Sequence, residues 1–320
     1  MQAIQVHKFG APEVMQLEEV PDLVPAENQL LIEVKAVGVN PVDTYIRAGV
    51  YPLKPELPYT PGKDAAGIVT AVGSAVVHRK VGDRIYVCGC PTGSYAQQLL
   101  CDEDQAFTLP DNITFTSGAA LGVPYSTASF ALNFRAHALP GETLLIHGAS
   151  GSVGIAAIQI AKANGLRVIG TAGTQAGLDL IKSQGVIAAL NHKSDNYLDA
   201  LNDLTCNQGV DVILEMLANV NLDKDLKLLA KFGRIVVIGN RGRIEIDPRD
   251  TMGKNASIHG MSLFNADTKV MHQIHASIKP GLIDGRYKPI IHSELPLAEA
   301  AKAHDLVMQE GVYGKVVLIP

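Results

Sequence analysis

The chain has 320 residues, of which 47% are hydrophobic and 18% charged, and its net charge is −5 at pH 7. This length exceeds the usual size of one hydrophobic core, so the sequence predicts two domains. The acidic balance gives no general attraction to nucleic acid or anionic membranes. No segment reaches the roughly 18 apolar residues that a membrane-spanning helix needs. With four cysteines and no signal-like start, the sequence predicts a cytoplasmic protein with reduced thiols.

Residues 1 to about 118 consist of short apolar or alternating runs separated by proline and glycine clusters. Examples of such runs are "QLLIEVKAVGV" and "DRIYVCG", with "LPYTPGKD" as a separating cluster. Alternation over strand-length segments predicts half-buried strands. We therefore expect a loop-rich, β-rich first domain.

From Leu144 onward, apolar runs of strand length alternate with helical stretches. The runs are "LLIH", "RVIG", "DVILEM", "RIVVIG" and "SIHGMSLF". This alternation predicts an α/β domain with a parallel sheet and helices on both faces. The last stretch, Pro280 to Pro320, returns to strand-like pieces around one helix. We expect it to rejoin the first domain.

The segment "TLLIHGASGSVGIAAIQIAKANGLRVIGTAGT" has a strand, a glycine-rich turn, a helix and a second strand. That is the layout of a dinucleotide-binding unit. Its glycines, Gly148, Gly151 and Gly154, are spaced three apart. We expect a tight turn at Gly151, close helix packing at Gly154, and a pyrophosphate at the N-terminus of the helix.

The second strand of this unit ends in "VIGTAGT", without the acidic residue that usually binds the ribose 2′-hydroxyl of NAD. The small and hydroxyl residues Thr171, Gly173 and Thr174 leave room for a 2′-phosphate and can donate hydrogen bonds to it. The missing acid and these small residues favour NADPH over NADH, although no Arg or Lys lies nearby in the sequence to pair with the phosphate.

Three short motifs could indicate other reaction classes. "GASGS" resembles a nucleophile elbow around Ser150, but Ser152 stands where that motif needs glycine, so a phosphate loop is preferred. The C-x-C pair "CGC" has no second ligand pair at zinc-finger spacing, and we expect ordinary strand residues there. His272 and His275 are spaced H-x-x-H, which lacks the helical geometry of a zinc pair. We expect both histidines to be exposed on a helix, and no metal.

Several stretches between residues 38 and 252 resemble one family: "GVNPVDTYIRAG", "LPYTPGKDAAG", "HGASGSVG", "GTAGT", "EMLANVNLDKDL" and "GNRGRIEIDPRDTM". They are similar to the zinc-free, zeta-crystallin-like quinone oxidoreductases of the medium-chain dehydrogenase/reductase superfamily. The resemblance implies a GroES-like catalytic domain, residues 1–120 and 266–320. It implies an inserted Rossmann domain, residues 121–265, and a cleft that holds NADPH.

The resemblance also implies which residues contact the cofactor. From the residues alone, His192 is a surface residue at a helix start, and Asn221 is an N-cap. Their places after predicted strands favour cofactor contact instead. Asn240 stands where the family has a serine. The implied contacts are Tyr45, Ser150, Gly151, Ser152, Val153, Gly173, His192, Asn221, Ile238, Gly239, Asn240, Arg241, Met261, Ser262 and Leu263.

The zinc alcohol dehydrogenases of the superfamily place Cys, His-Glu and Cys where this chain has Asn40, Lys63-Asp64 and Val123. Of the side chains that a catalytic zinc ion needs as ligands, the chain thus keeps only one carboxylate. Without a Lewis acid the hydride acceptor must already be electrophilic, as a quinone is, and an activated alkene in part.

The loop "GVNPVDTY" and the residues after it supply our catalytic candidates. Tyr45 and Tyr51 are expected to hydrogen-bond cofactor and substrate oxygens, and Asn40 to fix the nicotinamide side of the pocket. For Tyr51 the alternative is packing on neighbouring prolines. Asp43 is either a cap of the turn or a catalytic group.

The favoured function is NADPH-dependent quinone reduction, and the resemblance implies ortho-quinones reduced in one-electron steps. An alkenal or enoyl-thioester reductase is the second enzyme hypothesis. A non-enzymatic alternative is binding of AU-rich RNA or a crystallin-type structural role. The resemblance further implies a homo-oligomer, dimer or tetramer, formed through the strand "SIHGMSLF".

Overall fold

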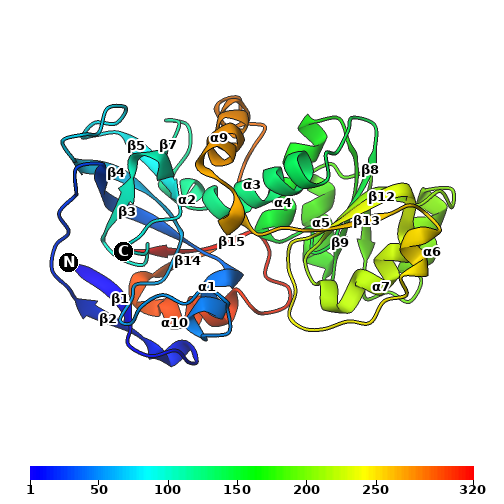
Figure 1. Cartoon of the computed structure of the whole chain (residues 1–320), viewed down its shortest axis with the longest axis horizontal. Helices are drawn as coiled ribbons and strands as arrows, with labels where there is room; N and C mark the ends of the chain where they lie inside the picture. Colours follow the sequence, from blue (N-terminus) through cyan, green and yellow to red (C-terminus); the bar gives the residue numbers. More distant parts are fainter. The chain divides into compact units, whose positions relative to one another are not determined.

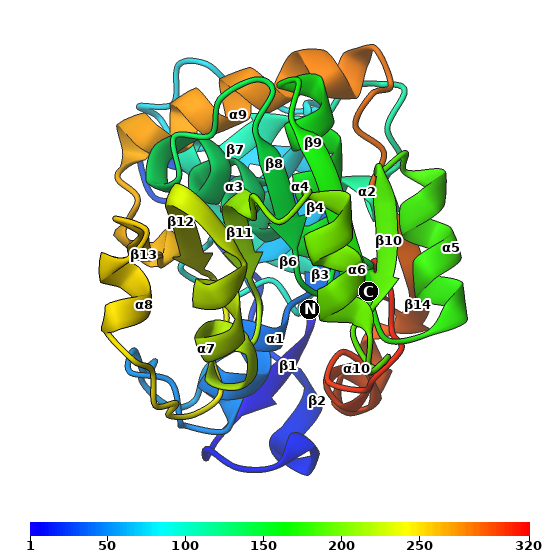
Figure 2. The ribbon, with the colours of Figure 1, turned by 90° about the vertical axis from the view of Figure 1, so that its right-hand side faces the viewer.

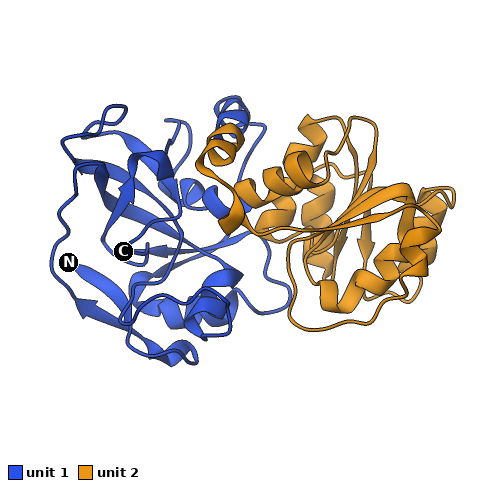
Figure 3. Ribbon diagram, in the orientation of Figure 1, with its two compact units in different colours: residues 1–124, 275–320 blue, residues 125–274 orange.

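The computed structural model describes residues 1–320 and divides the chain into two compact units. Unit 1 comprises residues 1–124 and 275–320, and unit 2 comprises residues 125–274 (Figure 3). The sequence placed the two junctions after residues 120 and 265. Both junctions of the structure fall inside helices, α3 (Gly122–Ser129) and α9 (Thr268–Ile283), so no loop marks them in the sequence. None of the helices is both long and apolar enough to span a membrane.

Unit 1 is built on a seven-stranded, mainly antiparallel sheet (Figure 1). Its C-terminal strand pairs antiparallel with β3, which brings the end of the chain into the sheet of the first segment. β6 (Gln98–Asp102) also pairs with β3. The other strands, in sheet order, are β14 (Ile291–Pro296), β15 (Lys315–Ile319), β3 (Gln29–Val39), β4 (Asp64–Val72), β5 (Arg84–Cys88) and β7 (Ala106–Thr108).

The alternation read in "QLLIEVKAVGV" is visible in β3, where Leu30, Ile32 and Val34 are buried on the core side. A separate two-stranded sheet precedes it. The remaining elements of unit 1 are β1 (Gln2–Val6), η1 (Pro12–Val14), β2 (Met15–Glu19), α1 (Pro41–Arg47), η2 (Glu103–Gln105), α2 (Phe115–Gly118), η5 (Leu297–Glu299) and α10 (Ala300–Leu306).

Helix α1 begins directly after β3 because the sequence supplies a start signal there. Pro41 occupies the first helical position, where its missing N–H costs nothing. The Asn40 backbone N–H donates to Asp43 Oδ2 at 2.9 Å, as in a capping box. Of the two interpretations of Asp43, the cap of the turn is therefore confirmed.

Unit 2 contains the expected parallel sheet, with six strands (Figure 2). In sheet order they are β10 (Ala188–Asn191), β9 (Arg167–Ala172), β8 (Thr143–Ile146), β11 (Val210–Glu215), β12 (Leu229–Val237) and β13 (Ser257–Gly260). Counted from β8, this is the order 3-2-1-4-5-6 of doubly wound dinucleotide-binding folds, so the predicted fold class is confirmed. Its helical elements are η3 (Phe130–Arg135), α4 (Ser152–Ala163), α5 (Gln175–Ser183), α6 (Tyr197–Leu204), α7 (Ala218–Leu228), α8 (Arg249–Met252) and η4 (Leu263–Asn265).

Two strands of unit 2 differ from the sequence prediction. β10 was not identified, because its four residues, "AALN", give too short a pattern. The expected strand "SIHGMSLF" was too long. Only Ser257–Gly260 pairs with β12, and the chain then turns into η4. β13 lies at one edge of the sheet.

Candidate cofactor and active site

The predicted cofactor residues of unit 2 all follow the carboxyl ends of its parallel strands. Since parallel strands end at the same edge of a sheet, these residues lie along one edge, where ligands bind in such folds. They come after each strand as follows: Ser150 to Val153 after β8, Gly173 after β9, His192 after β10, Asn221 after β11, Ile238 to Arg241 after β12, and Met261 to Leu263 after β13.

The turn after β8 forms a cradle of backbone amides. Gly148 adopts the left-handed conformation, with φ of 57°, and its carbonyl accepts from the Gly151 N–H at 3.1 Å. Gly151 itself has φ of −74° and is the N-cap of α4, so the tight turn is at Gly148 and our prediction for Gly151 was wrong. At Gly154 a Cβ would lie 2.6 Å from the Ala149 backbone, so the predicted close packing is confirmed.

No side chain caps the N-terminus of α4. Its first N–H groups are therefore open to an anion, and the helix dipole favours negative charge there. The predicted phosphate-binding residues Ser150, Gly151, Ser152 and Val153 surround this point and are partly exposed. The geometry fits the pyrophosphate of a dinucleotide.

The hydroxyl groups at the end of β9 are less available than the sequence suggested. Thr171 is fully buried, and its Oγ1 lies 3.5 Å from His147 Nδ1, so it cannot donate to a ligand. Thr174 is the N-cap of α5, where its Oγ1 accepts from the Gly177 N–H at 3.1 Å. The prediction of Thr171 as a donor to a 2′-phosphate was wrong, because its side chain points into the core.

Two side chains from the segment after β10 lie against Gly173. A Cβ placed on Gly173 would be 2.9 Å from His192 Nε2 and 3.1 Å from Lys193 Cε. His192 was identified from the sequence, but Lys193, which supplies a cation near the end of β9, was not. Lys193 was missed because β10 was not identified as a strand. Asn191 pairs with Ala172 across the two strands, which puts the residues after both strands side by side.

Asn221 lies inside α7, one turn after its start, so the alternative interpretation of Asn221 as an N-cap was wrong, and its contact with the cofactor stays a prediction. The N-cap is Leu217. The Asn221 Nδ2 donates to Glu215 Oε1 at 3.2 Å. This bond joins a predicted cofactor contact to a buried acid at the end of β11.

The segments after β12 and β13 are fixed mainly by their own backbone. A Cβ on Gly239 would lie 2.2 Å from the Met216 carbonyl oxygen, so glycine is required there. Asn240 Nδ2 donates to the Gly242 carbonyl at 2.8 Å, and Arg241 N–H donates to Asn219 Oδ1 at 2.9 Å. The Asn240 amide thus shapes the loop, whereas Ser262 and Leu263 begin η4.

In unit 1, the residues at the zinc-ligand positions form a buried polar network with a lysine. Lys315 Nζ donates to Asp64 Oδ2 at 2.8 Å and to Asn40 Oδ1 at 2.6 Å. Asn40 Nδ2 donates to the same Asp64 Oδ2 at 2.9 Å, and the Val123 N–H donates to Asp64 Oδ1 at 2.7 Å. Asp64 and Lys315 are 0% and 1% exposed. The carboxylate is thus fully occupied by a cation and two N–H donors.

This network changes the role of Asn40. Its side chain is 2% exposed, and both its oxygen and its nitrogen are engaged within the network. The predicted direct contact of Asn40 with the nicotinamide would require these bonds to break. Asn40 is better described as a residue that holds Lys315 and Asp64 in place below the start of α1.

Tyr45 and Tyr51, the other catalytic candidates, lie close together in unit 1. The Tyr45 carbonyl at the end of α1 accepts from the Val50 and Tyr51 N–H groups at 3.1 and 3.3 Å. Both side chains are partly exposed, unlike Asp43, Ile46 and Arg47 on the buried face of α1. The geometry leaves both rings in reach of a ligand, and their roles stay predictions.

Each of the two cysteine and histidine motifs set aside in the sequence contributes one buried residue. Cys90 is buried, and burial raises the pKa of its thiol to about 12, so it is not a thiolate ligand at neutral pH. His272 is exposed as expected, but the expectation was wrong for His275. His275 is buried, stacks on Phe107, and its Nδ1 lies 2.8 Å from Tyr86 Oη.

Comparisons with known proteins agree with this geometry. Residues 26–111 match the family described as "Alcohol dehydrogenase GroES-like domain", and residues 152–277 match "Zinc-binding dehydrogenase". A quinone oxidoreductase of Sus scrofa is 48% identical over 321 residues, which span the whole chain and 98% of the relative.

Two solved structures are also similar over almost their whole length. The Escherichia coli quinone oxidoreductase complexed with NADPH is 31% identical, with a TM-score of 0.91 and full coverage of both chains. The CurK enoyl reductase is 25% identical, with a TM-score of 0.91 and coverage of 99% and 98%.

The zinc of the second family description does not fit the residues of this chain. At the positions of the catalytic ligands, Asp64 is bound to Lys315, and the amide of Asn40 and the backbone of Val123 replace soft ligands. The two domain matches and the sequence identity to quinone oxidoreductases over the full chain do not depend on zinc. The chain belongs to the quinone oxidoreductases of the medium-chain dehydrogenase/reductase superfamily.

Proposed function

We propose that this chain is an oxidoreductase that reduces quinones with NADPH and without a catalytic metal. One observation carries the proposal: the carboxylate at the position of the zinc ligands is bound to the Lys315 ammonium group. A lysine in that position occupies the charge that would otherwise hold a Lewis acid. The reaction must then use an acceptor that is reactive without one.

The nicotinamide cofactor would bind along the carboxyl edge of the sheet in unit 2. The open N-terminus of α4 and the turn at Gly148 would hold the pyrophosphate through backbone N–H groups. Gly239 keeps the segment after β12 close to Met216, which shapes the next part of this edge. Bound NADPH would supply the hydride, and the protein would supply binding and orientation.

The preference for NADPH over NADH rests on the residues around Gly173. Lys193 brings an ammonium group to the end of β9, and no acidic residue stands there to bind a ribose 2′-hydroxyl. His192 lies on the same glycine. A 2′-phosphate at this point would gain a charge-assisted hydrogen bond from Lys193.

A quinone is the acceptor class that suits a site of this kind. Its reduction restores an aromatic ring, so the enzyme needs mainly to hold donor and acceptor in line and to exclude water. The similarity to quinone oxidoreductases over the full chain supports the same class. Tyr45 and Tyr51 are our candidates for hydrogen bonds to the quinone oxygens.

The test is NADPH oxidation with a panel of acceptors under identical conditions. Phenanthrenequinone, an enal and an enoyl-CoA separate the possible classes. The proposal expects the highest kcat/KM with the ortho-quinone. A higher value with either alkene would instead establish the second candidate, an alkenal or enoyl-thioester reductase, which the likeness to the CurK enoyl reductase favours.

Further parts of the proposal come from the family resemblance. Reduction in one-electron steps would release a quinone radical, which electron paramagnetic resonance during turnover would detect. The exposed edge of β13 supports self-association, and light scattering would give the size of the oligomer. RNA binding, tested by a gel shift competed with NADPH, and a cytoplasmic location stay predictions.

A further inference from the structure

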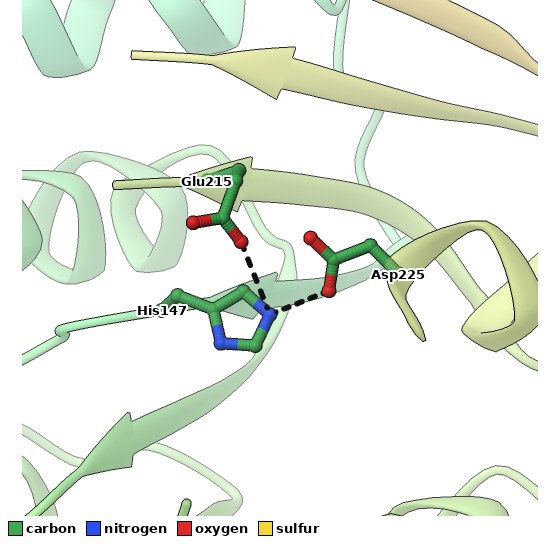
Figure 4. A group of neighbouring side chains, drawn as sticks. All are labelled: His147, Glu215 and Asp225. Atoms are coloured by element: carbon green, nitrogen blue, oxygen red, sulfur yellow. Dashed lines mark hydrogen bonds and ion pairs between the residues drawn. The ribbon is translucent and has the colours of Figure 1, made fainter. Parts of the chain in front are cut away.

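Three buried side chains below the carboxyl edge of unit 2 have no role in the site described so far. Figure 4 shows His147, Glu215 and Asp225 pointing toward one another. His147 follows β8, Glu215 ends β11, and Asp225 lies on α7. His147 Nε2 lies 2.8 Å from Asp225 Oδ1 and 3.5 Å from Glu215 Oε2.

The two acids cannot both be ionised in this place. Each is 0% exposed, and the two carboxyl groups and the His147 ring each place an oxygen or nitrogen within 4.8 Å of the other two. Burial, with Asp225 beside it, raises the pKa of Glu215 to about 8, and burial raises the pKa of Asp225 to about 6. Burial also lowers the pKa of His147, so the imidazole is neutral and supplies no cation.

One proton satisfies every polar atom of the group. Glu215 Oε2 and Asp225 Oδ2 are both buried without a hydrogen-bond partner. A proton on Glu215 Oε2 would donate to Asp225 Oδ2, while the His147 Nε2–H donates to Asp225 Oδ1. Glu215 Oε1 already accepts from the Leu217 N–H and from Asn221 Nδ2.

A bound metal ion is a weaker explanation for the same three residues. Ligand atoms around a tetrahedral zinc ion at about 2.0 to 2.1 Å are separated by about 3.3 Å. The 2.8 Å between His147 Nε2 and Asp225 Oδ1 is instead the length of a charge-assisted hydrogen bond. That bond places a proton on Nε2, where a metal would need the lone pair.

We propose that Glu215 and Asp225 share one proton and, together with His147, position Asn221 and the turn at Gly148 for the cofactor. The inference rests on the proposed function, since the cofactor is the one named there. Glu215 acts through Asn221, because Glu215 Oε1 accepts a hydrogen bond from Asn221 Nδ2. His147 immediately precedes Gly148 in the chain. All three are positioning residues, because none of them reaches the exposed edge.

The arrangement predicts a pH dependence of cofactor binding. The charged and titratable groups that face the pair are His147 after β8, Tyr197 from α6 and Lys224 from α7. Loss of the shared proton above about pH 8 leaves two like charges in a dry site. Their repulsion would separate α7 from the end of β11, displace Asn221 and weaken cofactor binding.

The first experiment follows the proton itself by infrared spectroscopy of the full chain in D2O. Wild type is expected to show the carbonyl band of a protonated carboxylic acid at pH 7, which disappears as pH rises through about 8. Glu215→Gln should lack this band. Asp225→Asn should move its loss to lower pH, because the neighbouring charge is gone. A wild type without the band, or a band that persists in Glu215→Gln, overturns the inference.

The second experiment measures the Kd of NADPH by fluorescence from pH 6.5 to 9.5. Wild-type affinity should weaken above pH 8 by up to about tenfold per pH unit. Glu215→Gln has no proton to lose in this range, so its Kd for NADPH, whatever its value at pH 7, should not change with pH above 8. The exposed-face variant Asp223→Asn on α7 is the matched control and should keep it.

The outcomes separate this inference from the proposed function. If Glu215→Gln retains the wild-type pH dependence, the positioning role is overturned. If wild type binds no NADPH at any pH, the proposed function fails, and the infrared band still decides the shared proton. Stoichiometric zinc uptake that Glu215→Gln abolishes would overturn the proton in favour of a metal.

Discussion

Each unit of the molecule buries acidic side chains, and the two units neutralise them in different ways. In unit 1, Asp64 is bound to the Lys315 ammonium group, with Asn40 bridging both. In unit 2, the side chain that contacts both Glu215 and Asp225 is a neutral histidine. A buried carboxylate needs either a partner charge or a proton. The first unit uses a lysine and the second, we infer, a shared proton.

The largest effect is expected when the cation of unit 1 is removed. Lys315→Met leaves the Asp64 carboxylate buried without its partner charge. Removing one member of a buried ion pair typically costs about 3 to 5 kcal/mol. Urea denaturation monitored by circular dichroism would measure this loss in the free energy of unfolding.

A matched control is Lys302→Met, which removes an exposed ion pair with Glu299. Exposed pairs contribute about 0 to 1 kcal/mol, so this variant should unfold close to wild type. Equal stabilities of the two variants would show that the Lys315 ammonium group is not needed to neutralise the buried Asp64 carboxylate.

The pH dependence of stability tests the group in unit 2. Burial raises the pKa of Glu215 from its ordinary value of 4.5 to about 8 in the folded chain. Between these values the folded chain keeps a proton that the unfolded chain has lost, so the free energy of unfolding falls as pH rises through this window. In wild type this slope is up to about 1.4 kcal/mol per pH unit, and Glu215→Gln should remove it.

The measurement is best made between pH 6 and 8, above the pKa of about 6 of Asp225. Urea midpoints at three pH values are sufficient. Parallel curves for wild type and Glu215→Gln would mean that Glu215 is ionised in the folded protein, contrary to our account.

A smaller effect is expected at the exposed cation beside Gly173. Lys193→Met should lower kcat/KM for NADPH by about tenfold or more, the value of one charge-assisted hydrogen bond. It should leave kcat/KM for NADH nearly unchanged, because NADH has no 2′-phosphate. Lys182→Met, an exposed lysine on α5, is the control. A similar loss with both cofactors would remove Lys193 from the 2′-phosphate site.

The smallest effect is expected at Tyr45, whose side chain is partly exposed. Tyr45→Phe removes one hydroxyl and should lower kcat/KM with quinone by about three- to tenfold. Tyr51→Phe separates a hydrogen-bonding role from ring packing, since packing survives the change. An unchanged kcat/KM in Tyr45→Phe would take Tyr45 out of the site.

The sequence predicted those features that depend on neighbours along the chain. The turn and helix around Gly148 to Gly154 follow from a local pattern, and so do the strands that flank them. Lys315 could not be predicted as the partner of Asp64, because 251 residues separate them and no local pattern links them. The contact of Glu215 and Asp225 with His147 could not be predicted for the same reason. Each is ordinary in its own element, and only the sheet order brings them together.

Lys193 and His275 show a second reason for incomplete prediction. Lys193 became visible only once β10 was known to pair with β9, a strand whose four residues carry little pattern. His275 was expected to be exposed on a helix together with His272, because no local pattern marks either histidine as buried. In the structure the two histidines differ in burial, since α9 turns one of them toward Tyr86 and Phe107.

The most direct test of the proposed function is one assay of purified, chelator-treated protein. NADPH oxidation is followed with phenanthrenequinone as acceptor, beside the same reaction with NADH. Our account predicts quinone-dependent oxidation that survives the chelator and has a higher kcat/KM with NADPH. Absence of quinone-dependent oxidation, or activity that returns only when zinc is added, would contradict it.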